Sequence, residues 1–154
     1  MSDIYEEHGP DCTCGCHDHD HEHRHDHDHA THDAFETDAA SISLEAHTHE
    51  QAATVSLDIH PKTGNAIAFS SLVDSMKTIA DEAETAGGVV GHIKAYARDG
   101  VSFAHASVTA PDLPPVCEGN VQASFGADAT IQLVSIVLLV DLDDLAAICR
   151  KAIA

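Results

Sequence analysis

The sequence predicts an α+β domain, with a mainly antiparallel sheet and two helices on one face, preceded by a disordered segment rich in histidine and cysteine. Residues 51–154 show strand-like alternation and helix-like spacing in the order β-α-β-β-β-β-α. Residues 1–50 hold 11 of the 14 histidines and no sustained apolar period. Such a polar segment buries too little surface to offset the entropy of ordering it. We expect a ferredoxin-like sandwich with an extra strand, in which the strand at 101–110 lies beside the strand at 54–60.

The first predicted strand covers residues 54–60 (TVSLDIH), because every second residue in it is apolar. Proline, glycine and asparagine within residues 61–65 then predict a turn. A helix follows over residues 71–86, where apolar residues recur at helical spacing, and Ser71 is its predicted N-cap. The glycines at 87–88 end this helix.

Two strands joined by a tight turn are predicted at 89–97 and 101–110. Asp99-Gly100 is a strong signal for a two-residue turn, and it sets a register in which Tyr96 faces Phe103. One face of this hairpin then carries small and apolar residues, which suits close packing under a helix. The other face carries His92, Lys94, Tyr96, Phe103 and His105.

The last part of the chain predicts strands at 121–125 and 130–140 and a helix that starts at Asp141. The strand at 130–140 is apolar on both sides, so we expect it in the interior of the sheet. Cys149 falls on the apolar side of the last helix and is expected to be a small core residue. Cys117 follows a proline-rich loop, and the sequence assigns it no role.

The net charge of −19 is unevenly distributed. Residues 1–50 have one arginine against 14 acidic residues, whereas residues 51–154 have six basic against 12 acidic residues. Such a chain repels nucleic acids and anionic membrane surfaces and attracts cations. The first residues contain neither a basic start nor an apolar run, and the longest apolar run is half of the roughly 20 residues that a membrane helix needs. We therefore expect a cytoplasmic protein that binds no nucleic acid and has no membrane insertion.

A dense set of metal-binding side chains lies in residues 12–29, which read CTCGCHDHDHEHRHDHDH. Thiolate and imidazole are the preferred ligands of zinc, nickel, cobalt and copper. Clustered cysteines in a reducing compartment indicate metal or redox chemistry rather than disulfides. The predicted metal ligands are Cys12, Cys14, Cys16, His17, His19, His21, His23, His25, His27, His29 and His32.

The spacing of two between these ligands favours an extended chain. Residues i and i+2 of an extended chain lie on the same side, about 7 Å apart, so two imidazoles can share one ion. On a helix the same residues point about 200° apart. The acidic residues between the histidines attract cations and serve as oxygen ligands or as acceptors for imidazole N–H groups. Eleven N and S donors suffice for about two or three four-coordinate ions.

The stretch HDHDHEHRHDHDH (residues 17–29) resembles the His-rich segments of nickel and zinc accessory proteins of the hydrogenase and urease maturation type. It is also similar to His-rich loops of zinc carriers. The resemblance implies a metallochaperone that stores or delivers divalent transition metal (Ni, Zn or Co), with a client metalloenzyme or metal transporter as partner. It does not extend to residues 54–154. The absence of a GxxxxGK[ST] loop excludes the GTPase type of nickel accessory protein.

Two other interpretations fit this stretch less well. An ordinary solvated, charged tail does not require histidine at every second position or cysteines beside it. A permanent structural zinc site uses separated pairs of ligands that bridge a fold, rather than a redundant series.

A second, weaker metal set is predicted on the sheet face that carries no helix. Its members are Asp58, His60, His92 and His105. The ferredoxin-like order places the strand of His105 between the strands of His60 and His92. Lys94, expected opposite His105, counts against a metal site because it adds a positive charge beside the ion.

The sequence contains no motif that indicates an enzyme. The patterns G-x-S-x-G, H-E-x-x-H and G-x-G-x-x-G are absent. Three hypotheses remain open at this point. The first is a metal-binding protein that buffers or delivers its ion. The second is a small enzyme or ligand-binding module that uses His60, His92 and His105, and the third is a homodimeric interaction scaffold built through the same sheet face.

Overall fold

The structure of the protein is a computed structural model, and it describes residues 30–154. The described residues form a seven-stranded sheet, a two-stranded sheet and two helices. The elements are β1 (Thr31–Glu36), β2 (Ala40–His49), β3 (Ala52–Pro61), β4 (Ile67–Ala68), α1 (Phe69–Thr85), β5 (Val89–Asp99), β6 (Ser102–Val108), β7 (Val116–Gly119), β8 (Ser124–Phe125), β9 (Thr130–Leu138) and α2 (Leu142–Ile153).

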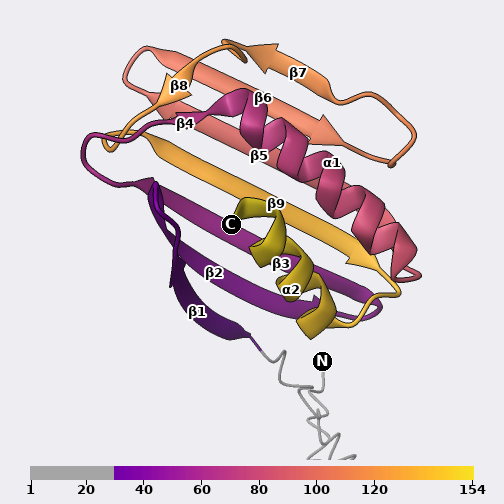
Figure 1. Cartoon of the computed structure of the whole chain (residues 1–154). Helices are drawn as coiled ribbons and strands as arrows, with labels where there is room; N and C mark the ends of the chain where they lie inside the picture. Colours follow the sequence, from indigo (N-terminus) through magenta and orange to yellow (C-terminus); the bar gives the residue numbers. More distant parts are fainter. Residues whose placement is uncertain (1–29) are drawn as a thin grey trace, which may run out of the picture.

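The large sheet has the strand order β1-β2-β3-β9-β5-β6-β7, and every neighbouring pair is antiparallel. Both helices lie on the same face of this sheet (Figure 1). α1 packs on β5 and β6, whereas α2 packs on β2 and β3. The predicted α+β class, with a mainly antiparallel sheet and two helices on one face, is confirmed. We call the opposite side of the sheet, which neither α1 nor α2 covers, the open face.

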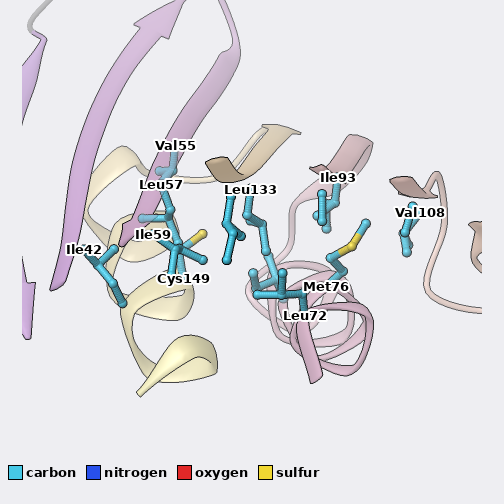
Figure 2. Close-up of a cluster of buried hydrophobic side chains, with 14 of the residues drawn as sticks. Ile42, Val55, Leu57, Ile59, Leu72, Met76, Ile93, Val108, Leu133 and Cys149 are labelled. Atoms are coloured by element: carbon cyan, nitrogen blue, oxygen red, sulfur yellow. The ribbon is translucent and has the colours of Figure 1, made fainter. Parts of the chain in front are cut away.

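The hydrophobic core fills the space between the sheet and the two helices. Ile42 and Leu57 lie on the side of Cys149 of α2 (Figure 2). Leu72 and Met76 of α1 lie on the other side of this layer, with Leu133 of β9 between the two groups (Figure 2). Side chains alternate between the two faces of a strand, so each strand contributes every second residue to the core. The helix-facing residues of β5 and β6 are mostly small, as predicted, and this lets α1 approach the sheet closely. They are Ile93, Ala95, Ala97, Ala104, Ala106 and Val108.

The strand order differs from the ferredoxin-like arrangement. That arrangement requires β6 beside β3, but β9 occupies this place and pairs with β3 on one side and β5 on the other. β6 lies outside β5, toward β7. β9 combines buried residues on the helix side with apolar residues on the open face. The middle of the sheet is where such a strand removes the most apolar surface from water, so its predicted interior position is confirmed.

The sheet begins before the predicted domain boundary at residue 51. β1 pairs with β2, and β2 pairs with β3 along its full length. The prediction of disorder is therefore wrong for residues 31–49, which form β1 and β2. Residues 1–29, for which disorder was also predicted, lie outside the described residues. In β2 every second residue is apolar and buried against the helices: Ala40, Ile42, Leu44 and Ala46. Pairing with β3 gives these residues the burial that offsets the entropy of ordering them.

β5 and β6 form the predicted hairpin with a register shifted by two residues. Tyr96 pairs with His105 rather than with Phe103. The turn consists of Gly100 and Val101, with a φ of 45° at Gly100. Glycine adopts a positive φ without steric cost, as at the first position of type II′ turns. Because the shift is two residues, every side chain remains on its predicted face.

α1 starts two residues before the predicted cap. Its N-cap is Ala68, which makes no side-chain capping bond, so Ser71 lies inside the first turn. Phe69 is fully buried, and its ring lies edge-on to that of Phe125 with the centroids 6.2 Å apart. The Phe69 N–H also donates to the Ala123 carbonyl at 3.0 Å. Tertiary packing thus overrides the local capping signal.

α2 starts where the sequence predicts. The side chain of Asp141, its N-cap, accepts a hydrogen bond from the Asp143 N–H at 2.9 Å. Near the other end of α2, Arg150 forms an ion pair with Asp33 and lies 5.3 Å from the ring centroid of Phe35. These two contacts hold the edge strand β1 against α2.

Two predicted features of the C-terminal half differ in detail. β8 is shorter than the predicted strand and pairs with β4 outside the large sheet. The loop around Cys117 contains β7, an edge strand that pairs with β6. No helix within residues 30–154 combines the length and the apolar composition needed to cross a bilayer.

Candidate functional site

Most of the predicted ligands of the Cys- and His-rich segment lie outside the described residues. His32 is the exception, because it lies on β1. Its side chain is exposed and lies opposite Glu45 of β2 in the register of the two strands. The stretch at 12–29 therefore precedes the edge strand of the sheet directly in the chain.

All six histidines within residues 30–154 lie on the open face. In β2, β3, β5 and β6 the neighbouring residues, which point to the other side of the strand, face the helices and form the core. In β1, His32 lies directly across from Glu45 of the open face. The open face leaves an imidazole in contact with water, which a polar side chain requires when it has no buried partner. The six residues are His32, His47, His49, His60, His92 and His105.

The structure does not bring His60, His92 and His105 together. They lie on β3, β5 and β6, and β9 separates β3 from β5. His92 pairs with Ile136 near the end of β9, whereas His60 is level with the start of β9. At about 3.4 Å per residue, His60 and His92 are about 20 Å apart along the strand direction alone. Within residues 30–154, no three His, Cys, Asp or Glu side chains are arranged to hold a metal ion.

His105 has an aromatic and an acidic cross-strand neighbour. Tyr96 lies opposite it on β5, and Glu118 lies opposite it on β7. Lys94, which the predicted register places opposite His105, pairs with Ser107 instead. Glu118 thus carries the one carboxylate that lies directly across from His105. The other two histidines of the predicted set, His60 and His92, lie far from His105.

Asp58 lines a depression on the open face. This depression has a volume of about 500 Å³, and His32, Ser43 and Glu45 also line it. Asp58 Oδ1 accepts a hydrogen bond from Nε2 of Gln132 at 2.7 Å. Among the ion pairs of the described part of the chain, none involves Glu45 or Asp58. The imidazole of His32 and the carboxylates of Glu45 and Asp58 line this depression, but these side chains are not arranged to hold a metal ion.

Three residues of this region were not among the predicted ligands: Glu45, His47 and His49. The signal for them is the alternation in ASISLEAHTH, which places polar side chains at every second position of β2. His47 and His49 have the same spacing of two as the histidines in residues 17–29. Both lie on the same side of an extended strand, which is the geometry that chelation by residues i and i+2 requires.

The two cysteines of the described chain differ in reactivity. Cys149 is buried in α2, and its Sγ donates to Oγ of Ser135 at 3.6 Å. Burial raises the pKa of the Cys149 thiol to about 11, so it stays protonated at neutral pH and is a poor metal ligand. Its predicted position in the core is confirmed. Cys117 is exposed on β7, and nothing around it indicates a role.

A separate cavity of about 280 Å³ lies on the helix side of the sheet. It is bounded by β2, β3, the start of α1 and the end of α2. Most of its lining is apolar, and the one ionisable side chain in that lining is Asp38. The histidines of the open face do not line this cavity. It is therefore not part of the enzyme or ligand-binding site predicted around His60, His92 and His105.

The described residues therefore place His32 beside acidic side chains of β2 and β3 but do not form a metal site by themselves. His32 belongs both to the predicted ligands and to the depression beside Asp58. Comparison of the chain with known protein families, with curated proteins and with solved structures found no match.

Proposed function

We propose that the protein binds divalent transition metal ions (Ni, Zn or Co) in the cytoplasm and buffers them or passes them to a client protein. The observation that carries this proposal is the run of three cysteines and seven histidines at every second position of residues 12–29. These are the side chains that such ions prefer. In a reducing compartment the cysteines remain available as ligands instead of forming disulfides.

The surplus of donors supports exchangeable binding. A tetrahedral ion needs about four ligands, so the 11 donors of the predicted set allow many alternative combinations. An ion can move between such combinations by exchanging one ligand at a time, without leaving the segment. A metallochaperone or a metal store requires this property, whereas a structural zinc site requires one fixed set.

The surroundings of His32 support the same proposal. The carboxylate of Glu45 lies directly across from it on β2 and attracts cations over a Debye length of about 8 Å. The whole chain has a net charge of −19, which acts in the same direction. The enzyme alternative loses support because His60, His92 and His105 lie on strands that do not place them together.

Replacing all seven histidines of residues 17–29 by glutamine in the full-length chain tests the proposal. We expect the native chain to bind more than one zinc or nickel ion, and the variant to bind at most one. Glutamine keeps a polar side chain of similar size but lacks the imidazole nitrogen that coordinates the ion. Competitive titration against a chromophoric chelator measures both the stoichiometry and the affinity.

The matched control replaces His60, His92 and His105 by glutamine and leaves residues 12–32 intact. This control is expected to keep the native stoichiometry. If the seven-histidine variant binds as many ions as the native chain, the proposal fails. Binding by the native chain is also expected to weaken steeply below pH of about 6, because protonated imidazole cannot coordinate a metal.

A further inference from the structure

The open face carries an apolar stripe along the middle of the sheet. β9 is the fourth of the seven strands in the sheet order, and Val134, Ile136 and Leu138 face outward from it. The exposed fraction of both Ile136 and Leu138 is 37%. The solvated face of an antiparallel sheet ordinarily presents polar residues. The outward residues of the first half of β9, Thr130 and Gln132, are polar. The apolar stripe therefore covers the second half of this strand, and we treat it as a candidate interaction surface.

The strands on either side of this stripe differ in the size and charge of their outward side chains. Those of β3 are mostly small and include one carboxylate and one imidazole: Ala52, Thr54, Ser56, Asp58 and His60. Those of β5 are large and include two cations: His92, Lys94, Tyr96 and Arg98. The open face is thus shallow and acidic on one side of β9, and raised and basic on the other side.

We infer that the open face binds a second copy of this chain, sheet against sheet, about a two-fold axis that runs along β9. This axis places β5 of each copy over β3 of the other, so large side chains meet small ones and cations meet carboxylates. The apolar residues of β9 pack against their own counterparts. A two-fold axis perpendicular to the strands would instead place β5 over β5 and oppose like charges.

The register of the strands specifies one ionic contact of this dimer. Asp58 pairs with Gln132, and Gln132 pairs with Tyr96, so the three residues form one row across the sheet. The two-fold axis therefore brings Asp58 of one copy opposite Tyr96 of the other, between Lys94 and Arg98. Within residues 30–154 of a single copy, neither Lys94 nor Arg98 forms an ion pair. In the dimer, Asp58 of each copy lies between Lys94 and Arg98 of the other copy. The symmetric interface therefore contains two such ionic contacts.

The area of the open face is sufficient for a stable dimer. With strands about 4.8 Å apart and a rise of about 3.4 Å per residue, the seven strands cover roughly 900 Å². Standard interfaces bury about 800 Å² per partner. Face-to-face sheets lie about 10 Å apart, and their side chains interdigitate, which fits the difference in size between β3 and β5. β1, to which the metal-binding stretch is attached, lies at the edge of the sheet, away from the axis.

Sedimentation velocity of the full-length chain in EDTA, across the micromolar range, tests this inference separately from metal binding. We expect a dimer in the absence of metal. Ile136→Lys and Asp58→Lys should each weaken the dimer by at least about a hundredfold, since each change acts twice in the symmetric interface. Far-UV circular dichroism verifies that each variant has the native secondary structure.

Two controls and one rescue variant complete the experiment. Val101→Lys, in the β5–β6 turn, and Asp74→Lys, on the exposed side of α1, repeat the same chemical changes away from the open face and should remain dimeric. The variant with Asp58→Lys, Lys94→Glu and Arg98→Glu restores opposite charges and should dimerise again. A native chain that stays monomeric at every concentration overturns the inference and leaves the face to a different protein. A native dimer that the rescue variant fails to restore overturns the placement of the axis along β9.

Discussion

Cys149 shows at the scale of one residue how burial changes the chemistry of a side chain. Its thiol is the single buried thiol of residues 30–154, and its neighbour is the hydroxyl of Ser135. Burial raises its pKa from 9.0 to about 11. Because the pKa of the Cys149 thiol is higher in the folded chain than in the unfolded chain, the protonated form of the thiol favours folding. This stabilisation is complete below the unfolded pKa and is lost as the pH rises through the folded pKa.

We therefore expect the free energy of unfolding of the native chain to fall between pH 9 and about 11. The fall should exceed that of Cys149→Ala by roughly 2–3 kcal/mol, because one pKa unit corresponds to about 1.4 kcal/mol. Urea unfolding at neutral pH and across this range measures the difference. Cys117→Ala, which removes an exposed thiol, serves as the control and should follow the native chain. Equal pH profiles for the native chain and Cys149→Ala would refute the assignment.

At the scale of the elements, the passage from α1 to β5 depends on two consecutive glycines. Gly87 has a φ of 89°, and the N–H of Gly88 donates to the Ala83 carbonyl at 2.9 Å, which closes the last turn of the helix. A Cβ atom at Gly88 would lie 2.7 Å from Cγ1 of Val137 and 2.9 Å from the carbonyl oxygen of Ala83. The glycine thus permits the close approach of this turn to β9.

Gly88→Ala is expected to lower the free energy of unfolding by about 1–3 kcal/mol, because the added methyl group overlaps both the backbone and a core side chain. Gly126→Ala is the matched control. Its added Cβ would meet the Asn65 carbonyl oxygen at 3.8 Å, an ordinary contact, so its effect should stay within about 0.5 kcal/mol. Urea unfolding of both variants measures the difference. A Gly88→Ala variant as stable as the control would show that the turn has room for the methyl group.

At the scale of the whole molecule, the fold and the proposed metal-binding stretch are separate in the chain. The core of residues 30–154 consists of apolar side chains from the sheet and the two helices. The proposed ligands precede β1, except for His32. Ligands that are neighbours in sequence can bind a metal in the folded and in the unfolded chain. Binding of this kind changes the folding equilibrium little, because only a preference for the folded state stabilises it.

The melting temperature of the zinc-saturated chain is therefore expected to lie within about 2 °C of its value in EDTA. Circular dichroism during heating, with and without zinc, measures it. The same samples must show zinc binding in the chelator titration for the comparison to count. A large rise in the melting temperature with zinc would indicate a site that forms only in the folded state, as in structural zinc sites.

The amino-acid sequence predicts the features that depend on neighbours in the chain. The alternation around Leu57 and the helical spacing around Met76 predicted β3 and α1, and the outward face of the β5–β6 hairpin was predicted even though its turn is shifted. Hydrophobic periodicity predicts which side of a helix or strand is apolar, and it depends only on residues that are close together in the chain. The same holds for the proposed ligands in residues 12–29, whose chemistry follows from their type and spacing.

Which elements lie side by side depends on contacts between distant parts of the chain. The insertion of β9 between β3 and β5 separates His60 from His92, and the pairing of β2 with β3 brings Glu45 near Asp58. The start of α1 at Phe69 likewise depends on packing against Phe125. These contacts join residues that are far apart in the chain. Their free energy comes from burial and strand pairing, which a local sequence pattern does not predict. The local sequence thus determines which face of a strand carries a histidine, whereas the order of the strands determines which other side chains that histidine meets.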